Sequence, residues 1–411
     1  MKLNKKEINW ILYDVGNSAY TLLVTAILPI YFAYIAKTDF ISETNYLAYW
    51  GYAQSIVTII VAFLAPIFGS AADSKNAKKR IFTYFFVIGV VFTVLMSIKM
   101  NTFLFLIIFV ISKVGYQASL VFYDSMLTDI TTKERMDSVS SHGYAWGYIG
   151  SCIPFIISLL IILKKDLLGI ETIAINISFY IIAIWWVIFT IPLLKTYKQK
   201  FFISETRAGV KDIVNRLSNT LKEIRKNKIL WMFLLSFFFY IDGVYTIISM
   251  ATAYGTSLGL SQNGLLIALL VTQIVAFPCA IIFSMLSRIM KTHTLIRICI
   301  IAYAIIVSYA IKLSTTFDFW VLAIAVGMFQ GAIQALSRSY YAKLIPAEAS
   351  GEYFGIYDIC GKGASFLGTF LVAIFTQFTG KQNLGVAVLL IMFILGIIFF
   401  ERSVYLSKKG A

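Results

Sequence analysis

Charged residues are scarce in this sequence, at 13% of 411 residues. Soluble domains carry about 25% charged residues, so the scarcity excludes an ordinary soluble protein. Hydrophobic residues make up 59% instead, and long uncharged runs such as "FIISLLIIL" and "VAVLLIMFILGIIFF" recur along the chain. Each run is part of a segment near the roughly 20 residues that span a bilayer. The runs lack the period-two alternation of a membrane β-barrel. The sequence therefore predicts an all-α polytopic membrane protein.

Histidine and cysteine are also rare, with two and four residues. The histidines are far apart in sequence, and the cysteines are scattered singly through the apolar runs: His142 and His293, and Cys152, Cys279, Cys299 and Cys360. This spacing does not fit a metal site or a catalytic nucleophile. No G-x-x-x-x-G-K-[ST] motif occurs, which argues against an ATP-driven pump. We expect neither an enzyme nor a bound cofactor.

The net charge of +15 could indicate a nucleic-acid-binding protein, but the placement of the charges excludes it. With the N-terminus inside, most Lys and Arg residues fall in cytoplasmic segments, as the positive-inside rule expects. No cleavable signal peptide is predicted after "MKLNKKEIN", since the apolar stretch that follows is too long. We expect a multi-pass protein of the cell inner membrane with both termini cytoplasmic.

Apolar windows between charged or turn-rich segments predict twelve spans. Their ranges are 8–36, 46–71, 81–99, 102–128, 139–163, 170–194, 229–254, 262–287, 294–313, 317–344, 352–378 and 383–404. We predict a six-helix bundle over 1–194, a cytoplasmic linker over 195–228 and a second six-helix bundle over 229–411. In the linker, "ETRAGVKDIVNRLSNTLKEIRKN" alternates apolar and basic residues at helical spacing, which predicts an amphipathic helix on the inner membrane face.

The two predicted bundles repeat one plan. "YDSMLTDITTKERMDSVSSHGYAWGYIGS" (123–151) corresponds to "YYAKLIPAEASGEYFGIYDICGKGASFLGT" (340–369), and "NSAYT" (17–21) to "DGVYT" (242–246). Internal repeats of this kind are typical of transporters, whose site lies between the repeats near the bilayer midplane.

The loop "GSAADSKNAKKR" lies between the second and third spans and resembles the G-x-x-x-D-R-x-G-R-K motif of the major facilitator superfamily. Gly69 and Asp73 match, whereas Ser74 replaces the usual Arg. A basic cluster follows: Lys75, Lys78, Lys79 and Arg80. The counterpart "SMLSRIMKTH" has Ser287 at the Asp position. The resemblance implies a major facilitator fold of twelve helices in two pseudo-symmetric bundles.

Within that superfamily, three stretches resemble the unknown-major-facilitator family, whose relatives include fungal vacuolar amino-acid effluxers. They are "LYDVGNSAY…PIYF", "YIDGVYT" and "QALSRSYYAKLIPAEASGEYFGIYDICGKGASFLG". Val15 and Gly16 stand where Trp and Ala are usual. The resemblance covers the full chain and implies a transporter.

The loop after the second span also predicts a gate. Gly69 lets a neighbouring helix approach, and the Asp73 carboxylate can pair with cations or with a helix N-terminus. We expect a gating network of Gly69, Asp73, Lys79 and Arg80 that holds the inner side shut in one state. The alternative is that the basic cluster only orients the chain in the membrane.

Four spans carry polar residues at helical spacing on one side. They are Asp14, Asn17, Thr21 and Thr25; Lys113, Gln117 and Asp124; Asp242, Thr246, Ser249 and Thr256; and Gln330, Gln334, Ser337 and Tyr341. These are spans 1, 4, 7 and 10, which line the central cavity in the fold that the resemblance implies. The stripes therefore predict a hydrated, charged pathway.

An ionised side chain near the bilayer centre costs roughly 2.5–3.5 kcal/mol, so it persists where it pairs or functions. We expect Asp14 and Asp242 to exchange protons or bind an ammonium group, and Lys113 to hold a substrate carboxylate. The alternative is that both aspartates only form structural hydrogen bonds. Tyr245 is a further candidate contact for the substrate, although packing is the default for an aromatic side chain.

Asp358 and Lys362 stand four residues apart in the eleventh span. They predict an intrahelical ion pair that neutralises two costly charges. A role for Lys362 in substrate binding is the alternative.

The sequence thus predicts a monomeric secondary transporter for a small polar solute, coupled to protons, with amino acids favoured. An efflux carrier for a hydrophobic metabolite or drug is a second possibility. A receptor or lipid-translocating protein on the same fold is a third.

Overall fold

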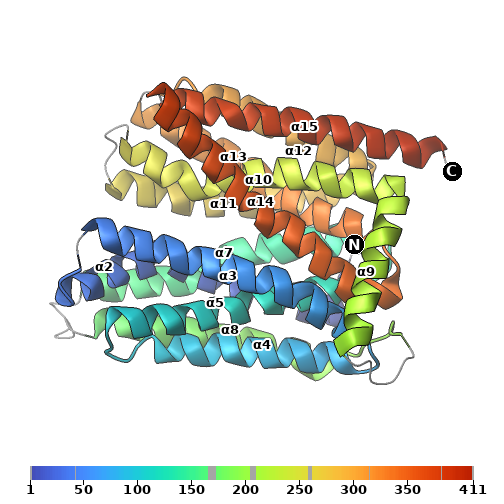
Figure 1. Cartoon of the computed structure of the whole chain (residues 1–411), viewed down its shortest axis with the longest axis horizontal. Helices are drawn as coiled ribbons and strands as arrows, with labels where there is room; N and C mark the ends of the chain where they lie inside the picture. The colour runs from blue at the N-terminus through green and yellow to red at the C-terminus, as the bar shows by residue number, and fades with distance from the viewer. Residues whose placement is uncertain are drawn as a thin grey trace. The chain divides into compact units, whose positions relative to one another are not determined.

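The computed structural model describes residues 2–41, 43–164, 173–203, 210–257, 262–313, 315–380 and 382–409. Within these ranges the regular elements are helices (Figure 1). The one β-type pairing there is an isolated bridge between Ser74 and Ile203. The all-α prediction is confirmed.

The helices follow the predicted spans closely. In chain order they are α1 (Lys5–Leu22), the π-helical turn η1 (Leu23–Ile27), α2 (Leu28–Thr38), α3 (Glu43–Ala72), α4 (Ala77–Leu95), α5 (Thr102–Ser125), α6 (Leu127–Ile130), α7 (Met136–Leu163), α8 (Ala174–Thr196), α9 (Val210–Lys226), α10 (Lys228–Ser257), α11 (Gln262–Leu286), α12 (Thr292–Ala310), α13 (Thr316–Leu344), the 3-10 turn η2 (Ala347–Ala349), α14 (Ser350–Thr379) and α15 (Gln382–Lys409).

Nine helical segments of the described chain are long and apolar enough to cross a membrane, and a tenth results if the bent pair Lys5–Ile27 and Tyr31–Thr38 is one span. The two other predicted spans, 81–99 and 352–378, coincide with α4 and α14. The chain is therefore a multi-pass membrane protein.

The bend in the first span has a local cause. Its two parts meet at 47° between Ile27 and Tyr31, directly after the π-helical turn η1. Pro29 follows within the first turn of α2 and has no N–H to donate to the carbonyl four residues earlier. π-helical turns are frequent at functional sites, and this one follows the polar stretch from Asp14 to Thr21.

The chain forms two compact units. Unit 1 comprises Met1–Thr131, Trp146–Arg207 and Ala347–Phe354. Unit 2 comprises Thr132–Ala145, Ala208–Pro346 and Gly355–Ala411. Two helices therefore belong to both units: α7 begins in unit 2 and continues in unit 1, and α14 begins in unit 1 and continues in unit 2. The division at 194 and 229 remains a prediction. The two units differ from it in that the N-terminal parts of α7 and α14 each belong to the other unit.

Glycines allow close helix packing within each unit. In unit 1, a Cβ on Gly115 of α5 would lie 2.5 Å from the backbone nitrogen of Gly89 in α4. In unit 2, a Cβ on Gly327 of α13 would lie 2.7 Å from the carbonyl oxygen of Thr272 in α11. Small residues at such contacts bring helix backbones together, which is the usual packing in membranes.

The linker contains the predicted helix, α9. Figure 1 shows it nearly perpendicular to α10, which follows it in unit 2. Thr220 and Ile224 of α9 are buried, whereas Lys222, Arg225 and Lys226 are exposed. The described part of α9 thus has one packed face and one basic face.

Candidate functional site

Asp14 in α1 is a buried carboxylate within a span of unit 1. It is 7% exposed, and its Oδ2 accepts a hydrogen bond of 2.7 Å from the hydroxyl of Tyr123 in α5. The side-chain amide of Asn17 donates to Oδ1 at 3.4 Å. The ring of Tyr123 stacks on Trp10 with centroids 4.4 Å apart, and the Trp10 indole N–H donates to the Tyr123 carbonyl. These contacts hold the hydroxyl in place for Asp14.

The polar side of α1 faces α5 along most of its length. Three hydroxyl pairs join the two helices: Tyr13 with Ser119 at 2.7 Å, Tyr20 with Ser112 at 3.0 Å, and Thr21 with Tyr116 at 2.8 Å. Tyr13 and Tyr20 are fully buried, whereas Thr21 is exposed at the surface of unit 1. The predicted stripe therefore begins in the core of the unit and ends at its surface.

Lys113 in α5 contacts the neighbouring helix α3. Its Nζ donates to the side-chain carbonyl of Gln54 in α3 and lies 5.7 Å from the ring centroid of Phe109. Ten residues separate Lys113 from Tyr123, which partners Asp14, so the two sites are about 15 Å apart along the helix. The predicted cation and carboxylate are separate positions of unit 1.

Asp242 in α10 is the corresponding buried carboxylate of unit 2. It is 0% exposed, and its Oδ1 accepts hydrogen bonds from the Gly368 N–H of α14 at 3.0 Å and from the Thr246 hydroxyl at 3.3 Å. A Cβ on Gly368 would lie 2.2 Å from Thr246 Oγ1, so the approach of α14 requires glycine. Among the residues that the structure describes, no donor reaches Oδ2.

Most of the other predicted cavity residues are half-buried in their own units, and Gln330 is buried. Gln117, Asp124, Tyr245 and Gln334 are half-buried, and Gln330 is 6% exposed. The side-chain amide of Gln334 donates to the backbone carbonyl of Gln330 at 3.1 Å.

A second polar cluster forms at the end of α3, also in unit 1. Asp73 is 0% exposed, and its two oxygens accept the N–H groups of Gly351 and Glu352 at 2.7 and 2.9 Å. These N–H groups belong to the first turn of α14, where the helix dipole favours a negative charge. A Cβ on Gly69 would lie 2.3 Å from the Gly351 carbonyl oxygen, so glycine at 69 permits this contact.

Lys78 of α4 supplies the positive charge of this cluster. Its Nζ lies 3.2 Å from Asp129 Oδ2 and 4.0 Å from Asp73 Oδ1, and it donates to the Ser350 hydroxyl at 2.8 Å. The Lys78 side chain is 0% exposed. We call these residues, Asp73, Lys78, Asp129 and Ser350 with the N–H groups of Gly351 and Glu352, the Asp73 cluster.

Two predicted gating residues lie outside the Asp73 cluster. Lys79 is half-buried and Arg80 is exposed, whereas Lys78 is buried. The basic run identifies the segment, but the start of α4 at Ala77 decides which of its side chains turns inward.

The first turn of α7 is held in unit 2 in a similar way. Asp137 is 5% exposed and accepts hydrogen bonds from Ser339 at 2.6 Å, Thr292 at 2.6 Å and Lys343 at 2.5 Å. Nearby, buried Arg338 donates to the hydroxyl and the carbonyl of Ser140 at 2.9 and 3.1 Å. We call these residues the Asp137 cluster.

Of the ion pair predicted in α14, the structure describes only the side chain of Asp358. Asp358 is half-buried, and the side chain of Lys362 lies outside those that the structure describes. The pair remains a prediction.

Sequence reasoning missed the partners of the predicted residues. These are Tyr123, Lys78 as the buried cation, Asp129, Asp137, Arg338 and Lys343. One signal was present, since four of the six lie within the repeated segments 123–151 and 340–369. Both repeated segments carry charged residues at the ends of corresponding spans, and this pattern could have indicated the partners.

Comparison with known proteins identifies the family. The profile of the vacuole effluxer Atg22-like family matches residues 38–410. The chain belongs to this family. It is 43% identical over 406 residues to an uncharacterised MFS-type transporter, YxiO of Bacillus subtilis (strain 168), with 97% of this chain and 94% of that protein covered. It is 24% identical over 409 residues to autophagy-related protein 22 of Vanderwaltozyma polyspora, with 87% of this chain and 77% of that protein covered.

Solved structures support the fold of this Atg22-like chain. The human organic anion transporter MFSD10 (TETRAN) matches with a TM-score of 0.74 over 97% of this chain and 100% of that one, at 10% identity. The major facilitator fold and the predicted family resemblance are confirmed. The Atg22-like chain is an MFS-type transporter in the membrane, and this family and fold are not those of an enzyme.

Proposed function

We propose that this Atg22-like transporter moves a small polar solute by alternating access, coupled to protons, with amino acids as the favoured solutes. The observation that carries the proposal is a pair of buried carboxylates, Asp14 in α1 and Asp242 in α10. Each is buried and lies inside a helical segment that is long and apolar enough to span the membrane. We place the protein in the cell inner membrane as a monomer, with both termini cytoplasmic.

The cost of these carboxylates supports a functional role. A charged group near the bilayer centre costs roughly 2.5–3.5 kcal/mol. Asp14 has the Tyr123 hydroxyl as a fixed partner, whereas Asp242 has one oxygen without a donor among the described residues. A carboxyl group with a spare oxygen can carry a proton there, so Asp242 is our first candidate for the coupling residue.

The path of α14 supports coupling between that carboxyl group and the Asp73 cluster. The helix begins at the Asp73 cluster in unit 1 and places Gly368 against Asp242 in unit 2. Gly351 and Gly368 are 17 residues apart, about 25 Å along one helix. We propose that loss of the contacts on the first turn of α14 is transmitted along this helix to the contact between Gly368 and Asp242.

The helix α7 also belongs to both units, but it begins in unit 2 and continues in unit 1. Its first turn is held by the Asp137 cluster in unit 2, and Gly147 meets α1 in unit 1. A Cβ on Gly147 would lie 2.8 Å from Ser18 Oγ and 3.2 Å from the Asp14 carbonyl oxygen. We propose that release and formation of the two clusters accompany the transport cycle.

The chemistry of the solute follows from the charges in the spans. Lys113 can hold a carboxylate and Asp242 can hold an ammonium group, whereas Asp14 lies too far from Lys113 along unit 1 for the two to bind the same amino acid. The family description, vacuole effluxer, supports a solute transporter and does not name the solute.

Flux measurements test the proposal. Protein reconstituted into liposomes is screened with radiolabelled amino acids and peptides, with and without an imposed pH gradient. We expect gradient-driven accumulation of at least one amino acid. Failure of all of these solutes, with flux of a hydrophobic dye instead, would favour the hydrophobic-efflux alternative.

Replacing Lys113 by glutamine is expected to weaken binding of solutes that carry a carboxylate. Hydrogen bonds to charged groups contribute about 1.5–3 kcal/mol, so the KM should rise by roughly ten-fold or more. The maximal rate should change less. Lys99→Gln is the control, because Lys99 is exposed outside the spans. Equal KM values in both variants would remove Lys113 from the substrate site.

The Asp73 cluster is expected to respond to pH. Complete burial raises the pKa of Asp73 from 3.8 to about 7. The Lys78 ammonium and the N–H groups of Gly351 and Glu352 oppose this rise in pKa, whereas the Glu352 carboxylate adds to it. A group whose pKa is higher in the closed cluster than in water stabilises the closed cluster at low pH. This contribution is lost as pH rises from about 4 through about 7.

Spin labels on the exposed positions Lys75 of unit 1 and Lys291 of unit 2 can report this equilibrium in a cysteine-free background. We expect the distance distribution between the labels to shift between pH 5 and pH 8, and Asp73→Asn to abolish the shift. Asp39→Asn serves as control, since this carboxylate lies outside the cluster and accepts from Thr102. A shift that persists unchanged in Asp73→Asn would contradict the prediction.

A further inference from the structure

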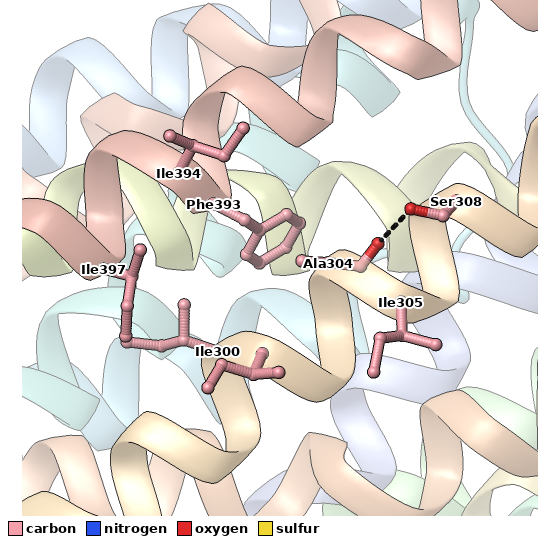
Figure 2. Close-up of a pocket in the computed structure, with 8 residues that line it drawn as sticks. Ile300, Ala304, Ile305, Ser308, Phe393, Ile394 and Ile397 are labelled. Carbon is pink, nitrogen blue, oxygen red and sulfur yellow. Dashed lines mark hydrogen bonds between the residues drawn. The ribbon is translucent and has the colours of Figure 1, made fainter.

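A groove runs between α12 and α15 in unit 2, with a volume of about 190 Å³ (Figure 2). Its walls are apolar side chains: Ile301, Ala304 and Ile305 of α12, and Phe393, Ile394 and Ile397 of α15. Drug-sized ligands occupy pockets of about 300–1,000 Å³, so the groove suits a narrower occupant.

The groove has no unpaired polar group among its described lining atoms. Ser308, at one end, donates its hydroxyl to the Ala304 carbonyl at 2.9 Å, as Figure 2 shows. Ile305 and Ile394 remain 64% and 52% exposed. Both helices qualify as membrane spans, so this face lies against hydrocarbon.

Beyond the other end of the groove, the two helices carry positive charge. Arg297 lies one turn before Ile301 and forms a bidentate ion pair with Glu401, which lies one turn after Ile397. His293 lies in the electrostatic field of Arg297, Lys291 and Lys408. Three cations and one carboxylate leave a net charge of +2 at this end, and both lysines are exposed.

The groove begins near the middle of the α12 span and runs toward its far end. Arg297 and Ser308 are 11 residues apart on α12, about 16 Å along the axis. Lys291 precedes α12, and Ile301 lies ten residues, about 15 Å, further along the axis, so an acyl chain that starts at this interface reaches the groove near the middle of a hydrocarbon core about 30 Å thick.

We propose that this groove is a binding site for an anionic phospholipid. One acyl chain lies along Ile301, Ala304 and Ile305, and the phosphate lies at Lys291, Arg297 and Lys408. Charge complementarity selects an anionic over a neutral headgroup, because each cation near the membrane surface contributes about 1 kcal/mol of attraction. The apolar walls select a lipid over free phosphate.

Native mass spectrometry of the full-length protein tests the site, with phosphatidylglycerol and phosphatidylcholine offered in equal amounts. We expect the wild type to retain phosphatidylglycerol preferentially. The double variant Lys291→Gln, Lys408→Gln should bind it about 25-fold more weakly, or about five-fold per cation, and bind phosphatidylcholine unchanged. Both lysines are exposed, so the fold should be retained.

Two further variants separate the groove from nonspecific attraction. Ala304→Phe fills the groove and should weaken binding of both lipids. Lys312→Gln removes an exposed cation just beyond the opposite end of α12 and should change neither. Equal retention of the two lipids by the wild type would overturn the proposal, as would an equal loss in Lys312→Gln.

Other occupants of the groove give distinct results, and each would overturn the proposal. A dimer mass that Ala304→Phe abolishes would show that a second copy of the chain covers the groove. Competition by inorganic phosphate alone, with Ala304→Phe unaffected, would show a simple anion site.

Discussion

Asp242→Asn is expected to abolish proton-driven uptake while leaving exchange of solute across the membrane intact. The asparagine oxygen can still accept the Gly368 N–H, so the fold should lose at most about 1 kcal/mol. The amide cannot exchange a proton with water. Uptake driven by a pH gradient should therefore fall to the level of protein-free liposomes, whereas counterflow of radiolabelled solute continues.

Two variants test whether the effect belongs to the carboxyl group of Asp242. Asp39→Asn makes the same chemical change outside the spans and should leave both fluxes unchanged. Asp14→Asn should reduce uptake less, because Tyr123 and Asn17 already occupy its oxygens. Loss of counterflow together with uptake in Asp242→Asn would assign this residue to solute binding. Normal proton-driven uptake would remove it from the mechanism.

Lys78→Gln is expected to open the Asp73 cluster. Lys78 is the cation between Asp73 and Asp129, all three side chains being almost fully buried. Removing one partner of a buried ion pair costs about 3–5 kcal/mol. Because the first turn of α14 depends on this cluster, the loss should appear as a shift in conformation and at least a ten-fold slower transport rate. The spin labels at positions 75 and 291 measure the shift.

Lys79→Gln is the matched control, since it changes the neighbouring residue in the same way. Lys79 is half-buried and outside the Asp73 cluster, so its variant should transport normally. Thermal unfolding of both variants distinguishes a shifted equilibrium from a damaged fold. Equal rates for the two variants would show that the Asp73 cluster does not control transport.

The helical framework could be predicted from the sequence because hydrocarbon imposes a simple requirement. A span needs about 20 apolar residues with all backbone groups bonded within the helix. The predicted span 102–128 corresponds to the helical segment Thr102–Ile130, and 170–194 corresponds to Ala174–Thr196. The bend after η1 could not be predicted in this way, since hydropathy carries no information about helix direction.

The candidate site could be predicted less completely. Asp14 and Asp242 were identified because a carboxylate in an apolar run is conspicuous. Their partners were not, because Tyr123 lies 109 residues from Asp14 and Gly368 lies 126 residues from Asp242. Residue spacing along one helix cannot predict which other helix lies against it.

The Asp73 cluster shows the same division. The motif identified Gly69 and Asp73, and the charge of the Asp73 carboxylate predicted a contact with cations or with a helix N-terminus. The start of α4 decides which lysine enters the cluster. Residues of the cluster are up to 279 positions apart in the chain, as Asp73 and Glu352 are. Only the packed structure brings them together.

The sequence by itself determined the class of the protein, the positions of its spans and the costly charges within them, because hydrophobicity is a property of each segment alone. The tertiary structure decided how those charges are paired, and that α7 and α14 each begin in one unit and continue in the other. Pairing depends on distances between residues far apart in the chain, which packing of the helices establishes.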